Sequence, residues 1–299
     1  MVERFKSAIE EIDYGYIHVP APEKSIIPNF DERGRVRLSV SKMQLFEKCP
    51  LAFKYSYLEK IDLKENEDRE RLDMGVNIHD ALYYASFQPN PAVLRSSELY
   101  GNYTVHFENF IRFQKLMKQK TGSSAPLYAE KEIFDKDDFV LMYIDRINDL
   151  GDGTVEILDY KTGNTGALSK HQFQLVLYTY YVEKHLMLRV SKWSILYTKE
   201  NKCKSMYVNR AKVRAIPEII KLVRQRMNAC FSVGFEKRPN QLCSWCSYMQ
   251  FGLCNSGQKS FNTFGLLEIF SKPWSENDDM SDINIPRRTV CGGIRVTSD

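Results

Sequence analysis

MYIDRI at residues 142–147 and VEILDYKTG at residues 155–163 are the two segments that decide the fold. Apolar and β-branched residues alternate in both, which predicts two strands. The tripeptide Gly151-Asp152-Gly153 lies between them and is typical of a tight turn. We therefore expect an antiparallel hairpin in which Leu150 lies opposite Thr154.

This register predicts that two carboxylates face each other. If Leu150 lies opposite Thr154, then Asp145 lies opposite Asp159, with Cβ atoms about 5 Å apart. Lys161 shares their face, because side chains two apart on a strand point the same way. Opposed carboxylates repel unless a cation lies between them, and magnesium or manganese is the usual one. A lysine beside such a metal is typical of phosphodiester hydrolysis. The alternative interpretation of these residues is a charged, solvated strand end without a function.

The composition is that of a globular protein. The chain has 299 residues, of which 43% are hydrophobic and 27% charged, enough for one large domain or two modest ones. No apolar run approaches the about 20 residues of a membrane span, and the N-terminus lacks a signal-peptide core. We expect a cytoplasmic protein with no membrane partner.

The distribution of charge is more informative than the net charge of +4. Between Lys202 and Arg226 there are eight basic residues and one acidic residue. Such stretches commonly face phosphates, although a solvated helix face is an equally good interpretation. Arg224 and Arg226 are the predicted nucleic-acid contacts in this stretch.

Helices and strands interleave along the chain around one small sheet, so the fold class is α/β, or mixed α+β. Residues 1–37 form an N-terminal arm, residues 38–254 the main domain, and residues 255–299 a C-terminal extension that we expect to be flexible in part. Ser41 and Gln44 fit a capping box that would begin a helix at Ser41. Residues 59–73 are expected to be an exposed, charged linker. Further helices are predicted at about 74–86, 97–120, 169–183 and 217–230, and further strands at about 127–134, 193–197 and 205–208.

Other polar residues could complete a metal and phosphate site. His79 lies in a helical stretch, and a neutral imidazole can add a ligand to two carboxylates. Glu130 opens the strand before Asp145 and is a possible further ligand, and Glu132 is an alternative. Gln174 and Tyr178 share one helix face, where they could hold a water or a phosphate and stack on a base. Each of these residues alone is more often structural.

Three cysteines form a stronger signal. Cys243, Cys246 and Cys254 are a cluster of three thiolates with aromatic neighbours. A soft metal or an iron–sulfur cluster needs a fourth ligand, and spacing alone makes zinc as good an interpretation as a cluster. The remaining cysteines of the chain are Cys49, Cys203, Cys230 and Cys291.

Taken together, these motifs resemble the RecB-type branch of the PD-(D/E)XK nuclease superfamily. More closely, they resemble its iron–sulfur members, the CRISPR-associated four-cysteine exonucleases and the AddB-type nucleases. The resemblance covers roughly residues 38–254. The matching pieces, in order, are Leu38-Ser39-Val40-Ser41 with Cys49-Pro50, Gly75-x-x-x-His79, Glu130, Ile144-Asp145-Arg146-Ile147, Leu158-Asp159-Tyr160-Lys161-Thr162-Gly163, Gln174-x-x-x-Tyr178, and the cysteines 243, 246 and 254.

The resemblance implies a restriction-endonuclease-like core, with a small mixed sheet flanked by helices. It also implies a helical subdomain that an iron–sulfur cluster holds together. It implies Mg²⁺ or Mn²⁺ held by His79, Asp145, Asp159 and the backbone carbonyl of Tyr160, with Glu130 as a possible further ligand. Lys161 would be the catalytic lysine, and Gln174 and Tyr178 would form the family's Gln-x-x-x-Tyr motif. Cys49 would join the C-terminal three cysteines around a 4Fe–4S cluster, with Zn²⁺ as the alternative.

The implied function is a metal-dependent DNA nuclease, most specifically an exonuclease acting on single-stranded or frayed ends in recombination, repair or CRISPR adaptation. The alternative is a nucleic-acid-binding or assembly subunit that cleaves only within a larger complex. Besides DNA, the expected partners are helicase, recombination or CRISPR-adaptation proteins.

Overall fold

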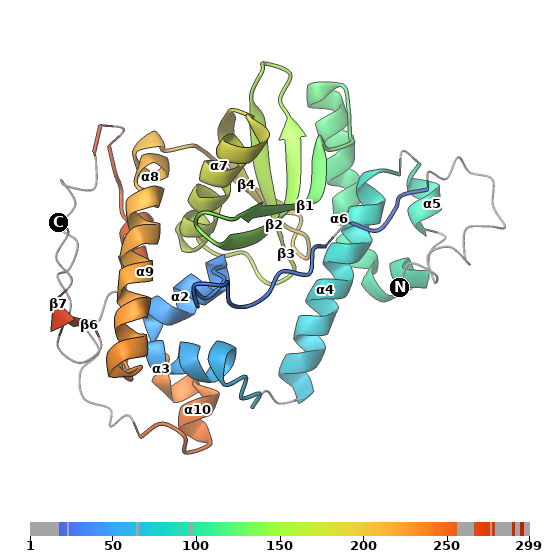
Figure 1. Ribbon diagram of the computed structural model, residues 1–299. Helices are drawn as coiled ribbons and strands as arrows, with labels where there is room; N and C mark the ends of the chain where they lie inside the picture. Colours follow the sequence, from blue (N-terminus) through green and yellow to red (C-terminus); the bar gives the residue numbers. More distant parts are fainter. Residues whose placement is uncertain are drawn as a thin grey trace.

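The computed structural model describes residues 18–22, 24–63, 66–88, 90–95, 98–255, 266–275, 277–278, 289–290 and 294–295. Its centre is a five-stranded sheet in the order β1-β2-β3-β4-β5 (Figure 1). Neighbouring strands are antiparallel except for β3 and β4, which are parallel. The strands are β1 (Tyr128–Asp135), β2 (Val140–Asp149), β3 (Val155–Lys161), β4 (Val190–Tyr197) and β5 (Lys202–Tyr207).

The hairpin of β2 and β3 has the predicted register. Leu150 N–H donates to the Thr154 carbonyl at 3.1 Å, and further along Arg146 pairs with Leu158. Gly151 and Gly153 have φ of +78° and +80°, a conformation that glycine adopts without a Cβ penalty. The turn chemistry thus fixes which residues of the two strands face each other.

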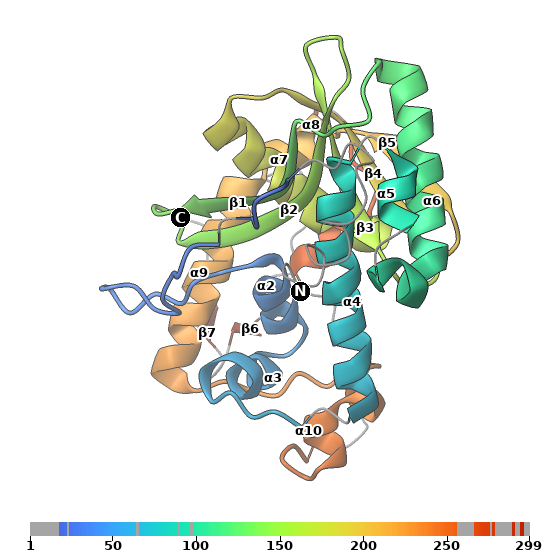
Figure 2. The same ribbon diagram turned by 90° about the vertical axis from the view of Figure 1, so that its right-hand side faces the viewer.

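Two layers of helices cover the sheet (Figures 1 and 2). α7 (Gln172–Leu186), preceded by a 3₁₀ turn (Leu168–His171), is the crossover that a parallel β3–β4 pair requires. It packs in one core with α2 (Val40–Lys48), α9 (Ile216–Val233) and the sheet face that carries Ile157 and Trp193.

The opposite face of the sheet carries Leu158, Tyr160 and Leu196 and packs in a second core with two other helices. These are α4 (Asn66–Ser86) and α6 (Glu98–Thr121), with the short α5 (Pro91–Arg95) between them. Successive residues of a strand point to opposite faces, so β3 supplies both cores.

One local prediction was wrong and another differs in its detail. α4 begins at Asn66, so the segment expected to be an exposed linker is helical over its second half. α2 begins at Val40, one residue before Ser41, with Ser39 in place of Ser41 as the N-cap: the Ser39 side chain accepts from Lys42 N–H. Charged residues are good helix formers, and a serine two positions away offered an equally good cap.

Segments from both ends of the domain meet below the sheet. α2 is followed by α3 (Pro50–Phe53) and a π-helical turn (Lys54–Leu58), and these lie beside α10 (Ser247–Gln250) in both views (Figures 1 and 2). Ser56 Oγ and Tyr248 Oη lie 2.7 Å apart, and Leu51 N–H donates to the Glu236 carbonyl at 3.1 Å.

The core extends beyond Cys254 into the C-terminal extension. Residues Leu266–Ser271 form a 3₁₀ helix (η4) whose Phe270 is buried against Phe173 of α7. Lys212 of α8 (Arg210–Arg214) is also buried and donates to the carbonyls of Phe270 and Lys272. The remaining elements are η3 (Cys243–Trp245) and a pair of short strands, β6 (Thr289–Val290) and β7 (Ile294–Arg295). Among the described helices, none has the length and apolar character to cross a bilayer.

Candidate active site

Three carboxylates lie in one row across three neighbouring strands. Continuing the registers of the flanking pairs places Glu130 of β1, Asp145 of β2 and Asp159 of β3 side by side. Glu130 has a φ of +46°, which is rare for a residue other than glycine and costs on the order of 1–3 kcal/mol. Strain of this kind is typical of functional positions, where the fold holds a side chain in one place.

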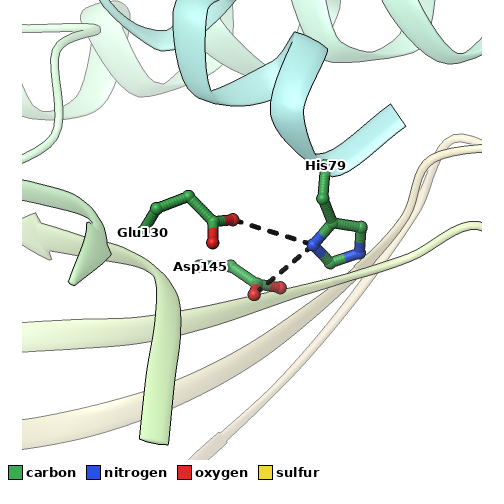
Figure 3. Close-up of side chains that lie close together, drawn as sticks. All are labelled: His79, Glu130 and Asp145. Carbon is green, nitrogen blue, oxygen red and sulfur yellow. Dashed lines mark ion pairs between the residues drawn. The ribbon is translucent and has the colours of Figure 1, made fainter. Parts of the chain in front are cut away.

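His79 of α4 lies against the first two of these carboxylates (Figure 3). Its Nδ1 is 3.5 Å from Asp145 Oδ1 and 3.8 Å from Glu130 Oε1. The potential ligand atoms of these three side chains all lie within 4.8 Å of one another. Both carboxylates are buried, whereas His79 is partly exposed, so the group opens towards solvent on the α4 side.

The carboxylates lie so close together that they shift the pKa values of the site. Burial disfavours a charged imidazole, but the charges of Asp145 and Glu130 outweigh it and raise the pKa of His79 to about 11. Burial together with the charge of Asp145 raises the pKa of Asp159 to about 6. Glu130 Oε1 is buried without a hydrogen-bond partner, and Asp159 Oδ2 has only the Lys161 ammonium beside it. A divalent cation would satisfy these oxygens and take the place of the proton on His79, so the donor set fits Mg²⁺ or Mn²⁺.

Asp159 is held from both sides. Lys161 Nζ lies 2.5 Å from its Oδ2, and Gln174 Nε2 donates to its Oδ1 at 2.8 Å. Gln174 also donates to Tyr178 Oη at 2.9 Å. The structure therefore brings Asp159, Lys161, Gln174 and Tyr178 together, as predicted, although Asp159 is not one of the three side chains that cluster around His79 Nδ1.

Lys161 carries a positive charge in this site. Burial disfavours that charge, but Asp159 and Asp145 outweigh it and raise the pKa of Lys161. Two residues that the sequence analysis missed surround it. Thr198 N–H donates to the Lys161 carbonyl at 3.0 Å, and the pKa of His171 is lowered to about 4 by burial and by the nearby charge of Lys161. Neither lies in a motif, so only the fold reveals them.

The backbone N–H of Tyr160 binds Asp145, whereas the resemblance implied a role for the Tyr160 carbonyl. Its N–H donates to Asp145 Oδ2 at 2.6 Å and so orients that carboxylate. Its ring is buried against His79 and Phe110. Metal coordination by its carbonyl stays a prediction.

Of the two carboxylates left open by the sequence, Glu130 is the one that faces the site. Glu132 instead accepts a hydrogen bond from Ser25 N–H of the N-terminal arm at 2.8 Å. The register of β1 and β2 separates them, because Glu130 lies opposite Asp145 whereas Glu132 pairs with Tyr143.

The predicted DNA contacts Arg224 and Arg226 point into the protein. Arg224 donates to the carbonyls of Val36, Asp138 and Phe139, which ties α9 to the start of the domain. Arg226 is buried and pairs with buried Glu47 of α2 at 3.0 Å. These contacts correct the prediction: the two guanidiniums join helices and strands of the protein. A count of basic residues does not show which helix face they occupy.

Arg226→Met is therefore expected to lower the free energy of unfolding by about 2 kcal/mol, since it removes the cation that pairs with buried Glu47. Chemical denaturation measures this, with exposed Arg33→Met as the control. The salt dependence of nucleic-acid binding should stay that of the wild type. A flatter salt dependence with unchanged stability would restore Arg226 as a phosphate contact.

The four cysteines of the predicted cluster line one cavity. Its volume is about 330 Å³, and Cys49, Cys243, Cys246 and Cys254 all contribute to its wall. Arg238 N–H donates to Cys49 Sγ at 3.4 Å, and Asn240 N–H donates to Cys243 Sγ at 3.2 Å. Backbone donors of this kind are a feature of sites that hold thiolate sulfur.

Among the His, Cys, Asp and Glu side chains of the described residues, only His79, Glu130 and Asp145 have ligand atoms that all lie within 4.8 Å of one another. The four cysteines share a cavity wall without forming so close a group. The choice between a 4Fe–4S cluster and Zn²⁺ at these cysteines stays a prediction.

Comparison with known proteins gives the family of the chain. The family model "PD-(D/E)XK nuclease superfamily" matches residues 37–251. The chain belongs to this superfamily.

One solved structure that the comparison matches is described as a putative exonuclease from Eubacterium rectale. It is 10% identical, with a TM-score of 0.47, and the match covers 74% of this chain and 90% of that one. No curated protein matches the sequence.

Proposed function

We propose that the protein is a Mg²⁺- or Mn²⁺-dependent deoxyribonuclease that degrades single-stranded or frayed DNA from its ends. The observation that carries the proposal is the row of Glu130, Asp145 and Asp159, with His79 at one end and Lys161 at the other. Membership of the nuclease superfamily supports phosphodiester hydrolysis as the reaction.

The metal would be held by His79, Glu130 and Asp145, with Asp159 beside them. A cation bound there supplies a water of lowered pKa and offsets negative charge on the phosphate.

The protein's own residues orient and balance the charges around that position. Tyr160 N–H fixes one oxygen of Asp145, and Gln174 fixes one oxygen of Asp159. Lys161, held in its charged form, lies where charge develops on a phosphate placed against the row, and it can steady that charge.

The test is incubation of the wild-type protein with end-labelled single-stranded and duplex DNA in Mn²⁺ or Mg²⁺, with RNA of the same sequence beside it. Progressive loss of DNA from an end is the expected result. Binding without cleavage by a metal-loaded protein would favour the alternative, an assembly subunit that cuts only within a larger complex. Cleavage of RNA alone would overturn the choice of DNA.

We propose further that the four-cysteine cavity holds a 4Fe–4S cluster. Its support is the convergence of Cys49, Cys243, Cys246 and Cys254 on one cavity, where backbone N–H groups donate to the sulfurs of Cys49 and Cys243. The cluster would be structural, because its cavity is separate from the carboxylate row. Helicase, recombination or CRISPR-adaptation proteins stay the proposed partners, on the resemblance of the motifs alone.

A further inference from the structure

A second cavity lies beside the catalytic centre. Its volume is about 460 Å³, and its wall includes Gln174 and Tyr178 of α7. Because the same Gln174 amide bonds Asp159, this cavity begins one side chain away from the carboxylate row. The rest of its wall comes from the segment before α2, from the first turns of α2, and from β2, and consists of Arg37, Ser39, Val40, Ser41, Lys42, Gln44, Leu141, Met142 and Tyr143.

Lys42 is the unusual member of this wall. It is 7% exposed, yet its Nζ donates only to neutral oxygens, the Arg37 carbonyl at 2.9 Å and Asn29 Oδ1 at 3.3 Å. In the described part of the chain it has no ion pair with a carboxylate. Burial, with the positive charges of Arg37 and Arg224, lowers the pKa of Lys42 to about 8. Buried charges in proteins are normally paired, so an anion is the missing partner.

The N-terminal arm holds the second cation of the cavity. Arg37 donates to the Ile27 carbonyl and to Asn29 Oδ1, the atom that also accepts from Lys42. Asn29 thus orients both cations towards one another. Figure 1 shows this arm, in dark blue, passing across α4 on its way to α2. It is anchored by Tyr83 of α4, whose hydroxyl donates to the Pro20 carbonyl at 2.9 Å.

The other groups of the wall suit phosphate oxygens. Ser39, Ser41 and Gln44 bring hydroxyl and amide groups from α2. Burial, followed by the charges of Asp159 and Asp145, raises the pKa of Tyr178 far above its usual value, so its hydroxyl stays neutral and can donate. Tyr143 adds an aromatic face, with Lys24 Nζ 5.8 Å from its ring centre.

We propose that this cavity is a subsite for a phosphate group of the nucleic-acid strand, adjacent to the phosphate that is cut, with Lys42 and Arg37 as its cations. The proposal rests on the proposed function and adds to it the part of the chain that holds the strand. Both a terminal phosphate monoester and an internal phosphodiester have the required chemistry.

The main test is binding of a fluorescent single-stranded oligonucleotide in metal-free buffer, measured by anisotropy over a range of salt concentrations. Lys42→Met keeps the side-chain length and removes the charge. It is expected to weaken binding about tenfold and to reduce the salt slope by about 0.7, the contribution of one phosphate contact in a single strand. The matched control is Lys221→Met, a half-exposed lysine of α9, which should bind as the wild type does. Equal affinity and slope for Lys42→Met and the control would overturn the proposal.

Inorganic phosphate gives a second measurement that needs no cleavage. Added phosphate should raise the melting temperature of the wild type and of Lys42→Arg. The melting temperature of Lys42→Met should be the same with and without phosphate. An equal rise in all three would place phosphate elsewhere and count against the subsite. Because Lys42→Arg keeps the charge, it also shows whether a defect of Lys42→Met reflects folding.

Matched oligonucleotides separate the two sources of phosphate. These carry a 5′-phosphate, a 5′-hydroxyl, a 3′-phosphate or a 3′-hydroxyl, with a circular single strand as the form without ends. A Lys42→Met defect confined to one phosphorylated end assigns a terminal monoester, and an equal defect on all, circles included, assigns an internal diester. Absence of DNA cleavage by the wild type in Mn²⁺ would overturn the proposed function. The metal-free binding measurements test the subsite alone.

Discussion

Lys161→Met is expected to lower the rate of DNA cleavage by about 10³-fold, with the fold retained. The variant removes the positive charge 2.5 Å from Asp159 that we propose steadies the phosphate in the transition state. Single-turnover cleavage of end-labelled DNA at saturating Mn²⁺ measures the chemical step. Lys170→Met, an exposed lysine nine residues further along the chain, is the control and should cut at the wild-type rate.

Metal binding separates the role of Lys161 from that of the carboxylates. Asp145→Asn should weaken Mn²⁺ binding by about 100-fold or more in calorimetry, because it removes a ligand charge. Lys161→Met should bind Mn²⁺ at least as well as the wild type, since it removes a repelling cation. Cleavage by Lys161→Met at the wild-type rate would show that the catalytic site lies elsewhere.

Cys49→Ser is expected to lower iron content and stability together. Cys49 faces three cysteines that lie about 200 residues later in the chain, so a shared cluster closes a very long loop, and its loss should cost at least about 4 kcal/mol. The melting temperature should then fall by about 8 °C or more. Activity should fall as a consequence of unfolding, because Cys49 is not part of the carboxylate row.

Anaerobic purification with iron, sulfide and zinc analysis and visible absorbance provides the measurement. Cys203→Ser, at an exposed position on β5, is the control and should keep the metal content and melting temperature of the wild type. A colourless protein with one zinc per chain would reject the cluster and leave the nuclease proposal intact.

The sequence predicted those parts of the fold that depend on local chemistry. Gly151 and Gly153 set the turn, and the turn sets the register that brings Asp145 opposite Asp159. The interleaved helices and strands likewise predicted the α/β or α+β class with one sheet, and the family resemblance implied that this sheet is mixed and flanked by helices. These features follow from backbone preferences within a few residues.

Features that depend on distant parts of the chain were not predictable in the same way. Arg226 appeared to be a phosphate contact until α9 was placed against Glu47 of α2. Glu130 and Glu132 point the same way on a strand, and only the register of β1 against β2 places the first opposite Asp145. The burial of Lys42 was not predictable from its sequence neighbours, because it depends on tertiary packing, and the Arg37 and Arg224 charges that lower its pKa come from the arm and from α9.

The position of Cys49 also has a consequence for the order of events during synthesis. At about 5–20 residues per second, the ribosome needs on the order of 10–40 s to add the roughly 200 residues that separate Cys49 from Cys254. Glu130, Asp145, Asp159 and Lys161 all emerge in that interval, so the nascent chain carries its complete carboxylate row before its cysteine pocket can close. During that time Cys49 is without the three other cysteines, so the 4Fe–4S cluster that we propose would be assembled late in maturation.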